Sequence, residues 1–156
     1  MATPFPFVAS AVLTAAQLNS IGEAWVSYTP TLTQGVGVTA TVASARWTQV
    51  NKIVTVQVGL NITATGTGAS LISVTVPIAP IAASYAGGFV GGAVGAGFFY
   101  DDSATANYSF TVVTTTSTLF YFMVTTASGS VLLGQNPGMA IANGDKLYFQ
   151  ATYEVA

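Results

Sequence analysis

The strongest constraint on the fold is the alternation of side chains along Ala45–Ile62, which reads ARWTQVNKIVTVQVGLNI. After Asn51 and Lys52, apolar residues alternate with polar residues or glycine. A period of two is the pattern of a β-strand with one face in a core. We therefore expect an all-β protein in which two strands are joined at Asn51-Lys52. The expected buried face of the second strand consists of Val54, Val56, Val58, Leu60 and Ile62.

Charged side chains are scarce, since they make up 5% of the sequence and soluble domains carry about 25%. A neutral surface of this kind favours a protein that covers much of itself with copies or partners. With three basic residues the chain is poorly suited to neutralise a phosphate backbone, so we expect no nucleic-acid ligand. The absence of Cys and His removes thiolate chemistry and the usual proton shuttle. We expect no enzymatic activity, no cofactor and no metal.

Residues 1–24 predict an arm followed by a short helix. Pro4 and Pro6 exclude a helix at the beginning of the chain. Thr14 and Gln17 form a capping box for a helix that ends near Gly22. Such a short helix is not stable alone, so it packs either on its own β-domain or beside symmetry mates. The residues we propose for attachment and oligomer contacts are Phe5, Phe7, Val8, Leu13, Leu18 and Ile21.

Residues 25–156 are expected to form one β-domain. Val26–Thr33 predicts a single strand, at an edge or with a bulge because it contains Pro30. Val38–Gln49 predicts a long strand that enters the central hairpin. A last strand follows the turn signal Asn143-Gly144-Asp145, with Leu147, Phe149, Ala151, Tyr153 and Val155 facing inward. In total, roughly eight to ten strands at this spacing predict an antiparallel β-sandwich, for which we favour a jelly-roll topology.

The uncharged segment Ile78–Tyr100 admits two interpretations. It is long enough to span a bilayer, and its glycines recur at the spacing of close-packed transmembrane helices. Pro80, the many glycines and the absence of flanking Lys or Arg argue against a membrane helix. We therefore favour a loop and then a Gly-rich strand, with glycines that admit another backbone, as at a subunit contact. The membrane alternative predicts that the protein depends on detergent.

Asp101 and Asp102 form the only pair of adjacent carboxylates, in the turn sequence DDSATAN. A glycosidase needs two carboxylates about 5–9 Å apart across one bond, which neighbouring turn residues rarely provide. We expect an Asx-type turn between strands. The alternative is a depolymerase, which predicts that Asp101→Ala and Asp102→Ala abolish cleavage of a polysaccharide.

Aromatic residues offer a second candidate feature, a platform on which a sugar could stack. They are Phe98, Phe99, Tyr100, Tyr108, Phe120, Tyr121 and Phe122. Aromatic residues in strands more often lie in a core, so we expect half or more of these to be buried. Binding residues favour loops, here Thr63–Ser70, Asp101–Asn107 and Gly134–Gly138. Our predicted ligand-binding residues are Tyr100, Asp101, Asp102, Asn107 and Tyr108.

The order of these segments resembles that of small phage virion proteins of the minor tail and tail-fibre kind. The similar segments are FVASAVLTAAQLNSIG, WVSYTPTLT, ARWTQVNKIVTVQVGL, SVTVPIAP, GFFYD and NGDKLYFQATYE, which together cover nearly the whole chain. Members of that family commonly have Gly where this chain has Asn51, and Ser where it has Ala9–Ser10. These departures leave the fold in place, but no ligand choice can be transferred residue by residue.

The resemblance implies a β-sandwich head, usually trimeric, that an N-terminal segment attaches to the virion. We therefore expect a structural protein of the virion, a short tail fibre whose head binds the host surface, with a glycan as the expected receptor. Its partners would be two further copies and other tail or baseplate proteins. The alternative is a trimeric decoration or cement protein on the capsid surface, which the short length favours. We expect no membrane insertion.

Overall fold

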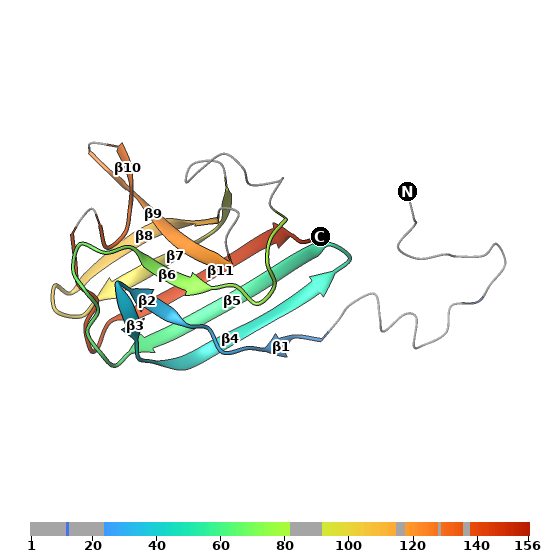
Figure 1. Ribbon diagram of the computed structural model, residues 1–156, viewed down its shortest axis with the longest axis horizontal. Helices are drawn as coiled ribbons and strands as arrows, with labels where there is room; N and C mark the ends of the chain where they lie inside the picture. Colours follow the sequence, from blue (N-terminus) through green and yellow to red (C-terminus); the bar gives the residue numbers. More distant parts are fainter. Residues whose placement is uncertain (1–11, 13–23, 82–91, 115–117, 128, 136–137) are drawn as a thin grey trace.

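The computed structural model describes residues 12, 24–81, 92–114, 118–127, 129–135 and 138–156 (Figure 1). Within this part the chain is all-β and antiparallel, as the sequence predicts, and it contains no helix. The expected N-terminal arm and helix fall outside the described residues. The same holds for every residue proposed for attachment and oligomer contacts, namely Phe5, Phe7, Val8, Leu13, Leu18 and Ile21.

The strands form one curled sheet in the order β1-β4-β5-β11-β7-β8-β9-β6-β2-β3, and β10 pairs with β9 outside this path (Figure 1). Their bounds are β1 (Val26–Ser27), β2 (Leu32–Gln34), β3 (Val36–Val38), β4 (Ala40–Val50), β5 (Ile53–Ile62), β6 (Ile72–Thr75), β7 (Ala93–Asp101), β8 (Ala106–Thr114), β9 (Leu119–Thr126), β10 (Gly129–Leu132) and β11 (Lys146–Glu154).

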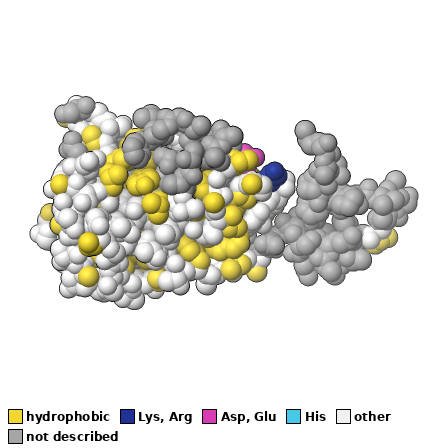
Figure 2. Space-filling model, viewed as in Figure 1, with side chains coloured by type: hydrophobic (Ala, Val, Ile, Leu, Met, Phe, Trp, Pro, Cys, Tyr) yellow, Lys and Arg dark blue, Asp and Glu magenta, His cyan; other side chains and the backbone are white. Residues whose placement is uncertain are grey.

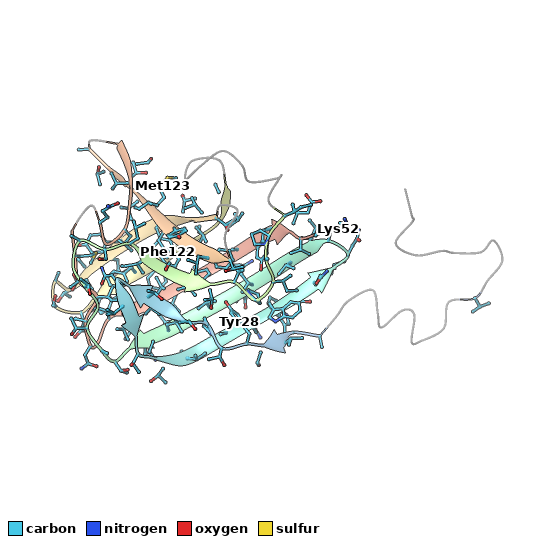
Figure 3. The ribbon with its side chains drawn as sticks, in the orientation of Figure 1. Tyr28, Lys52, Phe122 and Met123 are labelled. Carbon is cyan, nitrogen blue, oxygen red and sulfur yellow. The ribbon has the colours of Figure 1, made fainter. Side chains whose placement is uncertain are left out.

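The central hairpin of β4 and β5 confirms the prediction made from alternation. Val50 pairs with Ile53, so the turn consists of Asn51 and Lys52. Asn51 has a φ of 56°, a left-handed conformation that Asn tolerates better than most residues. Lys52 marks the tip of this hairpin in Figure 3. The predicted inner face of β5 is buried throughout: Val54, Val56, Val58, Leu60 and Ile62.

Strand β11 lies between β5 and β7 and carries the second predicted buried face. Its inner side chains meet the aromatic residues of β9 in the core. Phe120 makes edge contacts with Phe149 and Tyr153, each with ring centroids 5.5 Å apart. Phe122 is fully buried, whereas its neighbour Met123 is only partly buried (Figure 3). Each buried Phe stabilises the fold by about 1.5–3 kcal/mol relative to an exposed position.

The curl brings the two ends of the strand order together. Strand β3 is at one end of that order and β4 is next to the other end, yet only Thr39 separates them in the chain. Thr63 fixes this crossing, because both its backbone N–H and its hydroxyl donate to the carbonyl oxygen of Thr39, at 2.9 and 3.1 Å. The apolar inner faces consequently surround one core.

The single strand expected over Val26–Thr33 is wrong. The segment forms β1 at one end of the strand order and the start of β2 near the other end. Pro30 is buried between them, and it has no N–H to continue a ladder. After the break, Thr31 donates its backbone N–H to the Thr75 hydroxyl at 2.9 Å. The strand expected over Val38–Gln49 is also interrupted, because Val38 ends β3, Thr39 lies between the two strands, and β4 begins at Ala40.

Gln34 of β2 anchors two loops to the core. Its side chain is completely buried, and its amide nitrogen donates to the carbonyl oxygens of Met139 at 2.6 Å and Ser70 at 3.2 Å. Its amide oxygen accepts from the backbone N–H of Ile141 at 2.9 Å. A buried amide with three partners is well satisfied, so these contacts fix the positions of both loops.

The Gly-rich segment contributes strand β7, as predicted, and the glycines described within β7 face the chain itself. A Cβ atom added at Gly95 would meet the backbone of Gln150 in β11, and one at Gly97 would meet the backbone of Tyr148. Within the described residues, the close backbone approach predicted for this segment therefore occurs between β7 and β11 of one chain. No helix in the described part of the chain is long and apolar enough to cross a membrane.

Candidate functional site

The turn between β7 and β8 is an Asx-type turn, as expected for Asp101. The Oδ1 atom of Asp101 accepts from the Ser103 hydroxyl at 2.7 Å and from the backbone N–H of Ala104 at 3.0 Å. Asp102 is exposed beside it. Asp101 therefore has a structural role that accounts for its position.

A third carboxylate, Asp145, joins this turn to the one before β11. Asp145 is only 2% exposed, and its Oδ1 accepts from the backbone N–H of Asp102 at 3.0 Å. Its Oδ2 accepts from the backbone N–H of Ala142 at 2.7 Å. Burial raises the pKa of the Asp145 carboxyl, which these two hydrogen bonds oppose, and the charges of Asp101 and Asp102 add to the rise.

The carboxylates of this region do not form a metal site in the part of the chain that the structure describes, where no suitable group of three or more ligands occurs. The sequence identified Asn143-Gly144-Asp145 as a turn but gave no sign that Asp145 reaches the neighbouring turn.

The five predicted ligand-binding residues share a hairpin but not a surface. Tyr100 pairs with Asn107 across β7 and β8, and the Lys146 ammonium lies 5.7 Å from the centroid of the Tyr100 ring. Tyr108 instead packs against the core, with its ring centroid 6.3 Å from that of Phe99. The hairpin therefore separates the predicted set into a turn, an outward pair and an inward ring.

The candidate aromatic platform is divided in the same way. Phe99, Phe120 and Phe122 are fully buried in the core. Tyr100, Tyr108 and Tyr121 are partly buried, and only Phe98 is exposed, at 42%. Of the aromatic residues that the sequence singled out, Phe98 is thus the one that offers most of a ring to a ligand.

Phe98 belongs to an outward row that crosses three strands. It pairs with Tyr148 of β11, which pairs on its other side with Gly59 of β5. The Phe98 and Tyr148 rings stack, with centroids 5.2 Å apart and planes 28° apart. A Cβ atom added at Gly59 would lie 2.8 Å from the Tyr148 ring, so this ring occupies the space that a side chain would need. We call Phe98 and Tyr148 the aromatic row.

A row of amides runs parallel to it, one outward position further along the strands. Arg46 donates from Nε and Nη2 to Gln57 Oε1 at 3.0 and 2.9 Å, and Gln57 Nε2 donates to Gln150 Oε1 at 3.2 Å. The Arg46 guanidinium also lies 4.7 Å from the centroid of the Trp25 ring. We call Gln57 and Gln150 the amide row.

Between these two rows the outer face of β5, β11 and β7 has an open hollow of about 370 Å³. This volume is within the range of about 300–1,000 Å³ typical of small-molecule sites. The described residues that line it are all uncharged: Ser44, Gln57, Val58, Gly59, Ala96, Gly97, Phe98, Tyr148, Phe149 and Gln150. Stacking surfaces and amide groups on opposite sides can bind a ligand that is apolar on one side and polar on the other.

Sequence reasoning missed this hollow because its parts are distant in the chain. Alternation assigns Gln57, Tyr148 and Gln150 to outward positions, but Gln57 and Gln150 are 93 residues apart. Only the pairing of β11 with both β5 and β7 places them together.

Charge is scarce elsewhere too, since the whole sequence has three basic and five acidic residues. On the face shown in Figure 2, charged side chains appear only at one end, near the position of Lys52 in Figure 3. Comparisons with family models, curated proteins and solved structures found no match to this chain.

Proposed function

We propose that this chain is a structural protein of a bacteriophage virion, a short trimeric tail fibre whose head binds a glycan of the host surface. Residues 25–156 form the head, and residues 1–24 attach it to the tail or baseplate. The protein is not an enzyme and requires no cofactor in this role. The order of sequence segments that resembles minor tail and tail-fibre proteins supports the proposal, as does the antiparallel all-β fold.

The observation that carries the receptor-binding part is the uncharged hollow between the aromatic row and the amide row. Glycans present C–H faces and hydroxyl groups together, and these are complementary to aromatic rings and amides. One such site binds weakly, but a trimer repeated on a particle multiplies the contacts through avidity.

The assembly part of the proposal is a jelly-roll-like β-sandwich head that forms a homotrimer. Strands β3 and β4 lie near opposite ends of the strand order but are joined by a single residue, which is consistent with a sheet that curls into two facing layers. The ends of the strand order, β1 and β3, are edges that an oligomer could cover. The scarcity of charge supports a surface that is partly covered by copies or partners.

Cryo-electron microscopy of the intact virion tests the location directly. We expect three-fold density at the tail or baseplate into which the β-domain fits, and purified protein should then block adsorption of the phage to its host. Density on the capsid lattice would instead establish the alternative, a decoration or cement protein. Absence from the particle would refute both.

A further inference from the structure

We infer that the hollow between the aromatic row and the amide row is a subsite for one uncharged pyranose ring of a host saccharide. This inference rests on the proposed function and deepens it, because it assigns the residues and the chemical class of the ligand.

The aromatic row provides a stacking surface that is formed before a ligand arrives. Tyr148 is confined on one side by Gly59 and on the other by its stack with Phe98, and its hydroxyl donates to Asn61 Oδ1 at 3.5 Å. Phe98 leaves 42% of its surface exposed. Since these rings are already ordered, a pyranose that places its C–H face on them loses little side-chain entropy of the protein.

The amide row has a defined direction of hydrogen bonding. A guanidinium can only donate, so Arg46 requires the oxygen of Gln57 to face it. The Gln57 amide nitrogen must then donate to the oxygen of Gln150. Gln150 lines the hollow and uses its oxygen in this bond, so its amide N–H groups are the ones that a hydroxyl or ring oxygen of a bound sugar would accept from.

The charges around the hollow select an uncharged ligand. None of the described lining residues is charged, and the nearby cation Arg46 already contacts Gln57 and Trp25. The Lys146 ammonium lies over the Tyr100 ring. A carboxylate placed in the hollow would be partly desolvated without a cation among the lining residues, which is unfavourable. Neutral hexosides should therefore bind better than uronic acids.

The test is titration of ¹⁵N-labelled full-length protein with methyl glucoside, methyl galactoside, methyl mannoside, N-acetylglucosamine and glucuronic acid, followed by heteronuclear NMR. We expect at least one neutral pyranoside to shift the Gly59 and Gly97 backbone amides and the Gln150 side-chain amide. Glucuronic acid should bind at least about fivefold more weakly, and the acyclic control sorbitol should produce no such shifts.

Variants separate stacking and hydrogen bonding from effects on the fold. Phe98→Ala should weaken binding at least about fivefold, since aromatic contacts contribute on the order of 1 kcal/mol and 1.4 kcal/mol is tenfold. Tyr148→Phe keeps the ring and should retain binding. Gln150→Glu should lose it, whereas the matched exposed change Gln135→Glu should not.

The outcomes distinguish this inference from the function on which it rests. If host cells bind the protein and Phe98→Ala binds them equally well, the subsite is refuted while the function stands. If neither cells nor pyranosides bind, the receptor-binding function itself is refuted. A change of oligomeric state in Phe98→Ala, measured by light scattering, would mean that the hollow is covered by another copy and would overturn the inference.

Discussion

The two faces of strand β11 differ in what determines them. Its inner side chains Leu147, Phe149, Ala151 and Tyr153 are at most 5% exposed and pack in one core. Its outer side chains Tyr148 and Gln150 obtain their neighbours from register with β5 and β7. The inner face can thus be identified from the alternation of apolar residues along β11 itself, whereas the neighbours of the outer face depend on which strands lie beside it. Substitutions on the two faces should therefore have different consequences.

The largest expected effect is on the inner face. Phe149→Ala should lower the free energy of unfolding by about 3–5 kcal/mol, because it leaves a cavity among Phe120 and Phe122. Urea unfolding followed by circular dichroism measures this change. Tyr148→Ala, the adjacent residue on the outer face, is the matched control and should cost clearly less. Equal losses would mean that the outer rings are as important for stability as the core.

The second prediction concerns Gln34, a polar side chain that is buried with the core and is held by hydrogen bonds. Gln34→Leu keeps a similar volume but leaves the Ile141 N–H and the carbonyl oxygens of Met139 and Ser70 without this partner. The free energy of unfolding should fall by about 3 kcal/mol. Hydrogen exchange should also accelerate at Ile141. A stability equal to that of the wild type would show that both loops are held by other contacts.

The third prediction concerns a place where the inner face admits no side chain. In Gly97→Ala the new Cβ would meet the Tyr148 backbone and lie 2.6 Å from Phe149 Cβ and 2.8 Å from the Phe110 ring. Overpacking of this kind should reduce the free energy of unfolding by about 1–3 kcal/mol. Gly37→Ala is the control, because no atom lies within 4 Å of its added Cβ. Thermal unfolding of the two variants side by side gives the difference.

The smallest effect is expected at Asp145, and it depends on pH. Because burial raises the pKa of Asp145, the folded protein binds a proton more readily than the unfolded chain above the ordinary carboxyl pKa of about 4. The stabilising contribution of Asp145 to the free energy of unfolding is greatest below that pH and is lost as pH rises through the folded-state pKa.

Asp145→Asn should remove the part of the slope of unfolding free energy against pH that comes from this group. It should also lower the free energy of unfolding by about 1 kcal/mol, since one of two acceptor oxygens is lost. Urea unfolding measured from acid to neutral pH tests the prediction. Asp102→Asn, at an exposed carboxylate, should leave most of the slope in place. A slope of opposite sign in the wild type would contradict the assignment to Asp145.

The sequence was sufficient for features that depend on near neighbours. Alternation along Val54–Ile62 identified a buried face, and Asn51 identified a turn, because both signals lie within a few residues. The Asx-type turn at Asp101 is equally local. These features fix strands and their inner faces, which is why the all-β antiparallel class could be predicted.

What could not be predicted depends on order in space. Pro30 marks a break within Val26–Thr33, but the sequence does not indicate that the chain passes there from one end of the strand order to near the other. Gln57 and Gln150 meet at the hollow because β5 and β11 pair in one particular register. That register cannot be read from either strand's sequence alone. The five residues predicted for ligand binding were chosen by nearness in sequence, and their strands separate Tyr108 from Tyr100.

The short strand β1 has a mechanical consequence. It is only two residues long and is held at the edge by pairing with Arg46 and Trp47 of β4. A force that pulls the chain from its N-terminal side meets this pair first and can peel it away one bond at a time. The next strand, β2, lies between β6 and β3 and is anchored by the buried Gln34. Resistance to traction therefore begins at β2, and the release of β1 lengthens the chain between residues 26 and 31 without disturbing the core.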